Sequence, residues 1–293
     1  MEKVSDYYDA VAADYHHQYQ RENLHSSKEY PANYFRLQIL IQRLAAAQLS
    51  SVYEVGVGEG TPLTAIAAMG LRVAGCDISE SMVTRAREAF SRHGLDPNLV
   101  QWGDAEDATT LAAIAKPGTF DAAIAAGVLP HVRNDALFLN NVGMLVRSGG
   151  LVFIEFRNKL FSLFTLNRYT KEFILDELLI GVSPNVKAVV EEELNKRFAT
   201  DMPPVRAVAE GGTGPGYDMI LSRFHNPFEL LEIFKQCGYR DMKVHWYHYH
   251  PAPPMLEGRL GDAFRRSAMQ LEHEGTWRGW FLCSAGVIEA VKG

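Results

Sequence analysis

The sequence predicts an α/β fold in which a parallel sheet is covered by helices on both faces. Short apolar runs alternate with segments of helical periodicity across roughly residues 30–156. The strand-like runs are almost continuously apolar, as expected for strands buried on both sides. The chain has 293 residues, of which 47% are hydrophobic and 22% charged, so it is large enough for a substantial core.

The predicted elements follow one another in a regular order. Apolar residues at Tyr34, Leu37, Ile41 and Leu44 predict an amphipathic helix over residues 34–49. The strands that follow are predicted at residues 51–55, 71–76, 99–102, 120–125 and 150–156. The helices between them are predicted at residues 62–69, 81–91 and 136–145.

Polar residues mark where two of these helices begin. Ser79 precedes the helix at residues 81–91, where its hydroxyl can accept a hydrogen bond from an unpaired backbone N–H. Asn134 and Asp135 precede the helix at residues 136–145.

The regular alternation ends after Phe156. Residues 157–198 are predicted to be mostly helical, residues 200–217 are rich in proline and glycine, and strands return at 242–249 and 279–291. We interpret the excursion as a cap or lid beside a pocket; a stabilising appendage is the alternative. The predicted parts are a core with an N-terminal helical segment (1–156), a helical cap (157–225) and the rest of the core with its last two strands (226–293).

Composition and charge exclude several classes of protein. The net charge of −6 gives no basic field for a nucleic acid, so we expect no nucleic-acid partner. The N-terminus has no apolar secretory core, and no apolar stretch is long enough to span a membrane. Cys76, Cys237 and Cys283 are too far apart in sequence to suggest a disulfide framework or a thiolate zinc site. We therefore expect a cytoplasmic protein without a membrane partner, for which a homodimer stays open.

A glycine-rich loop after the first strand is the strongest local signal. In VYEVGVGEGT, the alternating Gly56, Gly58 and Gly60 allow a sharp turn and a close approach of ligand to backbone. The third glycine comes one position earlier than in the dinucleotide fingerprint, where Thr61 stands instead. Glu54 would also repel a pyrophosphate. The loop therefore favours a cationic ligand over NAD.

Acidic residues follow the next two predicted strands. Asp77 stands where a carboxylate can accept hydrogen bonds from both hydroxyls of a ribose. Its alternative role is to cap the helix that begins beside Ser79. Asp104, in the segment GDAED after the third strand, can accept a hydrogen bond from an adenine amino group.

Taken together, the segments EVGVGEG, VAGCDIS, QWGDAED, FDAAIAAGVLPHV and GGLVFIEF resemble the motifs of class I methyltransferases that use S-adenosylmethionine (SAM). The resemblance implies a Rossmann-like sheet of seven strands, mostly parallel, with the last strand antiparallel. It also extends to YYDAVAADY near the N-terminus, whose tyrosines close over the cofactor in small-molecule methyltransferases. Pro62 departs from the small residue common at its position, although proline is tolerated in a first helical turn.

The resemblance assigns the cofactor contacts residue by residue. It implies that glycines face the methionine part of SAM, Asp77 the ribose, and Ile78 and Met82 the adenine. The residues predicted to bind the cofactor are Tyr8, Tyr15, Glu54, Gly56, Gly58, Gly60, Asp77, Ile78, Met82, Asp104, Ala105 and Gly127.

Four histidines are candidates for a catalytic base or a pocket wall. His131 follows the fourth strand at the carboxyl edge of the sheet, where α/β proteins bind ligands; a packing role is its alternative. His225 follows the glycine-rich stretch and would line the pocket. His248 and His250 share one face of a strand, so they could line a polar pocket, supply a base or bind a metal. They could also belong to an exposed aromatic strand, and because nothing in the spacing supplies a third ligand, we expect no metal.

The sequence thus predicts a SAM-dependent methyltransferase that acts on a small hydroxylated metabolite by in-line displacement, with histidine as the base. The segments RFHNPFELLEIFKQCGY and WYHYHPAPP resemble methyltransferases of bacterial glycan and natural-product clusters, which favours O-methylation of a sugar or natural product. The alternatives are N-methylation of a small amine, a SAM-binding protein without transfer activity, and an NAD-dependent oxidoreductase, which Glu54 and Thr61 oppose.

Overall fold

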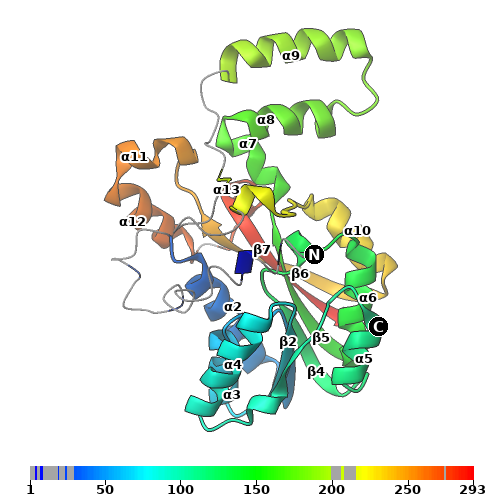
Figure 1. Ribbon diagram of the computed structural model, residues 1–293. Coiled ribbons are helices and arrows are strands. Elements are labelled where there is room, and N and C mark those ends of the chain that lie inside the picture. The colour runs from blue at the N-terminus through cyan, green and yellow to red at the C-terminus, as the bar shows by residue number, and fades with distance from the viewer. Residues whose placement is uncertain are drawn as a thin grey trace.

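A seven-stranded sheet forms the centre of the molecule in the computed structural model (Figure 1). The structure describes residues 4, 7, 8, 19, 24, 30–198, 206–207, 216–273 and 275–293. The strands are β1 (Ser51–Val55), β2 (Arg72–Asp77), β3 (Val100–Trp102), β4 (Phe120–Ala125), β5 (Val146–Arg157), β6 (Tyr239–Tyr249) and β7 (Cys283–Lys292). Their order is β3-β2-β1-β4-β5-β7-β6, and β7 alone runs antiparallel to its neighbours. The predicted fold class is confirmed.

Helices cover both faces of the sheet (Figure 1). One face carries α2 (Ala32–Ala46), α3 (Thr61–Ala68) and α4 (Glu80–Arg92), and the other carries α5 (Ala108–Ile114), α6 (Asp135–Leu145) and α10 (Pro227–Gln236). Alternate residues of each strand supply the two cores, so Val52 packs with Leu40 while Tyr53 packs with Phe138 and Phe234. Both cores are closed because the central strands β1 and β4 are buried on both sides.

The helix starts follow the predicted polar residues. The Ser79 hydroxyl accepts a hydrogen bond of 3.1 Å from the Met82 N–H, and Asn134 accepts one of 3.0 Å from the Leu137 N–H. Helix α5 was not predicted, since its alanine- and threonine-rich sequence has little periodicity. It begins at Asp107, whose carboxylate accepts from the N–H of Thr109 at 2.9 Å.

Helices after β5 extend away from the sheet. They are η5 (Lys159–Phe161), α7 (Ser162–Thr165), α8 (Arg168–Phe173), the π-helical turn η6 (Ile174–Leu178) and α9 (Pro184–Phe198). The first of them is packed, since Leu160 and Phe161 are buried, whereas α8 and α9 stand beyond the sheet (Figure 1). Within the described part of the chain, no helix combines the length and the apolar character needed to cross a membrane.

A second addition separates β6 from β7, and the sequence did not predict it. It consists of η8 (Pro254–Leu256), α11 (Glu257–Leu260), α12 (Asp262–Leu271) and α13 (Gly279–Leu282). The prediction of a strand at residues 279–291 is therefore wrong for residues 279–282, which form α13. A Cβ at Gly279 would lie 2.5 Å from the Trp246 ring, so close packing on that indole explains the glycine there.

Gly75 of β2 packs closely against the end of β1 and the loop that follows it. A Cβ at this position would lie 2.3 Å from Val57 Cγ1 and 2.6 Å from the Glu54 carbonyl oxygen. We expect Gly75→Ala to lower the free energy of unfolding by about 1–3 kcal/mol, because the backbone oxygen cannot move aside freely. Urea denaturation measures this loss. Gly258→Ala is the matched control, since open space surrounds Gly258, and equal stability of the two variants would contradict the explanation.

Candidate active site

A cavity of about 900 Å³, part of it open to solvent, lies at the carboxyl ends of β1, β2 and β4. Most of the predicted cofactor residues line it. They are Tyr8, Glu54, Gly56, Gly58, Asp77, Ile78, Met82, Asp104, Ala105 and Gly127. Of the predicted histidines, His131 lines the same cavity, whereas Tyr15 lies outside the described residues. Residues that sequence reasoning missed complete the lining, among them Val4, Tyr19, Val57, Pro62, Glu106, Val128 and Val132.

The glycine loop wraps around the end of β2. The N–H groups of Gly56 and Val57 donate to the Cys76 carbonyl oxygen at 2.7 and 3.0 Å. Gly56 has a φ of 77°, and a Cβ there would lie 2.3 Å from Val128 Cγ2. Gly58 has a φ of 54° and open space where a Cβ would project. The loop therefore leaves its backbone accessible to a ligand.

Gly60 has a different role from the one predicted. It does not line the cavity. With a φ of 90°, it begins α3, and a Cβ there would lie 3.1 Å from the Cα of Ala86 on α4. The close packing of α3 against α4 explains this glycine.

Asp77 connects the loop to the next helix. One carboxylate oxygen accepts from the Gly58 N–H at 2.8 Å and the other from the Ser79 N–H at 2.9 Å. Asp77 is only 9% exposed, and it lines the cavity. The carboxylate contacts the helix start at Ser79, as the capping alternative expects. It also lies at the cavity wall, where a ribose contact stays a prediction.

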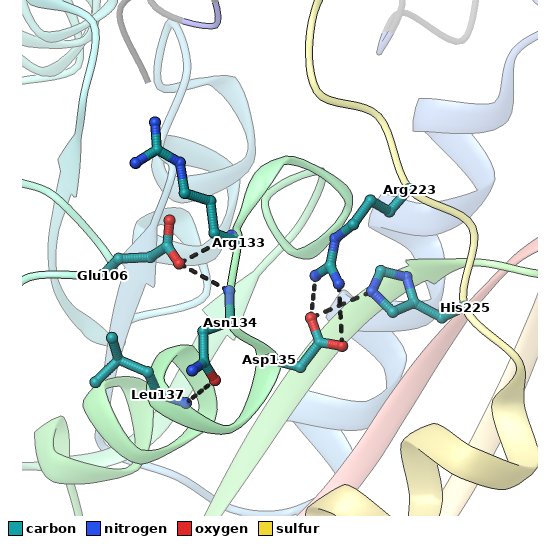
Figure 2. A network of polar contacts seen from close by, with 7 residues as sticks. All are labelled: Glu106, Arg133, Asn134, Asp135, Leu137, Arg223 and His225. Carbon is teal, nitrogen blue, oxygen red and sulfur yellow. Dashed lines mark hydrogen bonds and ion pairs between the residues drawn. The ribbon is translucent and has the colours of Figure 1, made fainter.

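Asp104 and Glu106 hold the wall formed after β3. Asp104 Oδ1 accepts from the Glu106 N–H at 2.9 Å, and burial raises the pKa of Asp104. Glu106 in turn accepts from the N–H groups of Arg133 and Asn134 at 2.8 and 2.9 Å (Figure 2). The segments after β3 and β4 are thereby joined at the cavity.

Glu54 is a buried carboxylate at the base of the cavity. It is 1% exposed, and its Oε2 has no hydrogen-bond partner among the described residues. Burial raises the pKa of Glu54 to about 8; the charges of Asp77 and Glu59 add to the rise, and Arg36 opposes it. A positively charged ligand would favour the ionised carboxylate, whereas a negatively charged one would oppose it.

Arg36 of α2 is a buried cation that sequence reasoning missed. Its guanidinium lies 3.8 Å from Glu155 Oε2, and that oxygen accepts from the Gly127 N–H at 2.7 Å. The second Glu155 oxygen accepts from the Tyr247 hydroxyl at 3.1 Å. Arg36 looked like one more polar residue of an amphipathic helix, because its acidic partner is far away in sequence.

His131 faces the cavity in a defined tautomer. Its Nδ1–H donates to the Leu221 carbonyl oxygen at 2.6 Å, which leaves the Nε2 lone pair to accept from the Tyr8 hydroxyl at 3.0 Å. Burial lowers the pKa of His131 to about 4, so the imidazole is neutral at pH 7.

His225 lies away from the cavity. It is buried, and its Nε2 lies 3.4 Å from Asp135 Oδ1, which also pairs with Arg223. Figure 2 shows Asp135 facing both residues at the start of α6. The prediction that His225 lines the pocket is wrong for this cavity, because the segment 223–225 is tied to α6 instead.

His248 and His250 also lie outside the cavity. Their rings stack at 4.7 Å, and His248 stacks on Tyr30 at 4.8 Å. Burial lowers their pKa values to about 4 and about 2, and neither ring nitrogen of His250 has a hydrogen-bond partner in the described chain. They form part of a packed layer under Phe161 and Phe264. Across the residues that the structure describes, no group of three potential ligands could hold a metal ion.

The Asp135 contacts generate a stability prediction. Burial by itself would raise the pKa of Asp135, but the hydrogen bonds from His225 and Arg223 outweigh it and lower that pKa. We expect Asp135→Asn to cost about 2 kcal/mol of unfolding free energy at pH 7. The lowered pKa means that this stability is present above the unfolded-state pKa and is lost as pH falls through the folded-state pKa.

Denaturant titrations at several pH values check this expectation. Asp241→Asn is the control, because Asp241 pairs with Arg240 while both side chains are exposed. A deficit in Asp135→Asn that stays constant down to acidic pH would contradict the ion-pair explanation.

Comparisons with known proteins agree with this geometry. Residues 53–152 match the family described as a methyltransferase domain. The ubiquinone biosynthesis O-methyltransferase of Rhizobium etli is 31% identical over 149 residues, which are 50% of this chain and 57% of that protein. The Mesorhizobium japonicum enzyme of the same name is 30% identical over 145 residues, 50% of this chain and 56% of its own. The chain thus spans just over half the length of these curated relatives.

Solved structures show the same fold at low sequence identity. Magnesium protoporphyrin IX methyltransferase from Synechocystis PCC 6803, solved with bound S-adenosylhomocysteine (SAH), has a TM-score of 0.52 at 14% identity and covers 99% of this chain and 98% of its own. A Haemonchus contortus phosphoethanolamine N-methyltransferase has a TM-score of 0.52 at 17% identity over 99% of this chain and 58% of its own. The domain match thus places a methyltransferase domain at residues 53–152, and the solved structures share the fold of the chain.

Proposed function

We propose that this protein transfers a methyl group from SAM to a hydroxyl group of a small acceptor, with His131 as the base. The observation that carries this proposal is the neutral His131 imidazole, whose Nε2 faces the cavity while its Nδ1–H is held by Leu221. The names of the curated relatives, which are O-methyltransferases, support transfer to oxygen. A sugar or a natural product is the acceptor class that we propose.

The residues present fit the cofactor. Glu54 Oε2, which has no partner in the described part of the chain, suits a ligand with positive charge, and the open backbone at Gly58 leaves room for it. SAM supplies an activated methyl group on a sulfonium when it is bound. Asp77 would hold the ribose, Asp104 the adenine amino group, and the backbone around Gly56 and Gly127 the methionine end. Arg36 and Glu155 stabilise the wall beside Gly127.

His131 would take the proton of the acceptor hydroxyl. The Leu221 carbonyl fixes the tautomer, so the basic nitrogen always faces the cavity. The Tyr8 hydroxyl contacts that nitrogen and would give way to the acceptor. Holding the acceptor oxygen in line with the methyl group would supply much of the rate, since orientation lowers the barrier to displacement.

The helical cap proposed for residues 157–225 contacts this site at its end. The Tyr217 ring lies 6.3 Å from the His131 ring, and Leu221 holds the imidazole. The Arg223 N–H also donates to the Pro130 carbonyl oxygen at 2.9 Å. These contacts support a cap that closes the acceptor side of the cavity and positions the base.

Asp77→Ala tests the cofactor contact. We expect the variant to bind SAH at least several-fold more weakly, because the hydrogen bonds to the ribose are lost. Isothermal titration calorimetry measures both affinities. Asp96→Ala is the control, since Asp96 is exposed and caps a short helix away from the cavity. Unchanged SAH affinity in Asp77→Ala would remove this residue from the site.

His131→Ala tests the base. With an acceptor found by screening hydroxylated compounds and amines for SAH release, we expect kcat to fall about 100-fold while SAH affinity is retained. His273→Ala, an exposed control, should keep wild-type turnover. Because the pKa of His131 is lowered to about 4, this group should cause no loss of wild-type rate between pH 8 and pH 6. Full turnover in His131→Ala would rule out a histidine base and favour an amine acceptor.

A further inference from the structure

Arg157 is the last residue of β5, at the carboxyl edge of the sheet where the cofactor cavity lies. Residues two apart on a strand point to the same face and lie about 7 Å apart. Arg157 therefore shares a face with Glu155, which accepts from the Gly127 N–H at the cavity wall. Arg157 thus lies two residues beyond that contact, at the carboxyl end of β5.

The side chain of Arg157 contacts an aromatic ring and a hydroxyl group. Its guanidinium lies 4.7 Å from the centre of the Tyr217 ring, and it donates a hydrogen bond to the Ser222 hydroxyl. Its positive charge helps to lower the pKa values of both His131 and His248. The side chain is partly buried.

Three arginines near the site have acidic partners, whereas Arg157 has none among the described residues. Arg36 pairs with Glu155, Arg206 with Asp218 and Arg223 with Asp135. Among the described residues, no carboxylate oxygen lies within 4.0 Å of a nitrogen of Arg157. A partly buried guanidinium without a counter-ion costs free energy, which an anionic ligand would offset.

We propose that Arg157 anchors an anionic group, a carboxylate or a phosphate, on the methyl acceptor. The guanidinium would bind two oxygens of that group, and the surrounding rings would contact the body of the acceptor. The accepting hydroxyl would then lie towards His131. This assignment rests on the proposed function and narrows it, because a neutral sugar would leave the cation unpaired.

The test compares benzoate with benzamide, which has the same shape without the charge. Calorimetry on the full chain saturated with SAH keeps the probes out of the cofactor site. We expect wild-type protein to bind benzoate at least about tenfold more tightly than benzamide. Phenyl phosphate in a parallel titration distinguishes the two sources of negative charge, since the tighter anion indicates the group on the natural acceptor.

Variants locate the binding site. Arg157→Gln should reduce the preference for benzoate to less than about twofold, whereas Arg157→Lys should retain part of it through its charge. Arg240→Gln removes an exposed arginine at the opposite edge of the sheet and should behave as wild type. Circular dichroism verifies folding, and if Arg157→Gln fails to fold, the wild-type comparison and Arg157→Lys decide.

Equal affinities for benzoate and benzamide, no benzoate binding, or an unchanged preference in Arg157→Gln would overturn the proposal. Benzoate binding that disappears when SAH is present would also overturn it, because the anion would then occupy the cofactor site. The SAH titration is made first and separately. A protein that does not bind SAH counts against the proposed function, whereas SAH binding without an anion preference counts against Arg157 alone.

Discussion

The rest of the site depends on the buried carboxylate of Glu54. Its Oε2 has no partner among the described residues, and burial raises its pKa to about 8. Ionising such a group in the free protein is costly, so a ligand that brings a positive charge gains affinity by compensating it. The glycine loop above it leaves backbone exposed to that ligand. Charge and shape together favour a sulfonium nucleoside over a dinucleotide.

The strand order gathers the remaining groups around this carboxylate. Strands β1, β2 and β4 are neighbours, so the residues that follow each strand meet at one edge of the sheet. Strand β5 adds Glu155 and Arg157 on the same face, one beside Gly127 and one further out. The Leu221 carbonyl oxygen then holds the His131 imidazole through a hydrogen bond. In the proposed function, the residues nearest the sheet contact the cofactor and those further out contact the acceptor.

Much of the core could be predicted because its signals are local. Alternating apolar runs give the parallel strands, and Ser79 and Asn134 mark helix starts through bonds to residues three positions on. The loop glycines were also apparent, but Gly60 shows the limit of that signal. A glycine that packs two helices and a glycine that lies beside a ligand look identical in sequence, and only the Ala86 contact separates them.

Residues with distant partners could not be assigned from the sequence. Arg36 and Glu155 meet across more than a hundred positions, and no local pattern announces the pair. His225 was predicted to line the pocket, because its contact with Asp135 joins residues that lie far apart in the sequence. His248 and His250 stack on each other, in agreement with strand alternation. Phe161 and Phe264, which belong to helices added to the core, pack against His250. The residues around a histidine in the sequence do not distinguish a catalytic base from a ring packed in the core.

Calorimetric titration of the wild-type protein with SAH and, separately, with NADH at pH 7 tests the central claim most directly. Both ligands carry an adenosine, so the comparison isolates the part of the ligand that meets the loop and Glu54. We expect saturable binding of SAH and no detectable binding of NADH. Binding of NADH as tight as that of SAH would contradict the assigned role of Glu54, because this carboxylate would then not discriminate against a pyrophosphate.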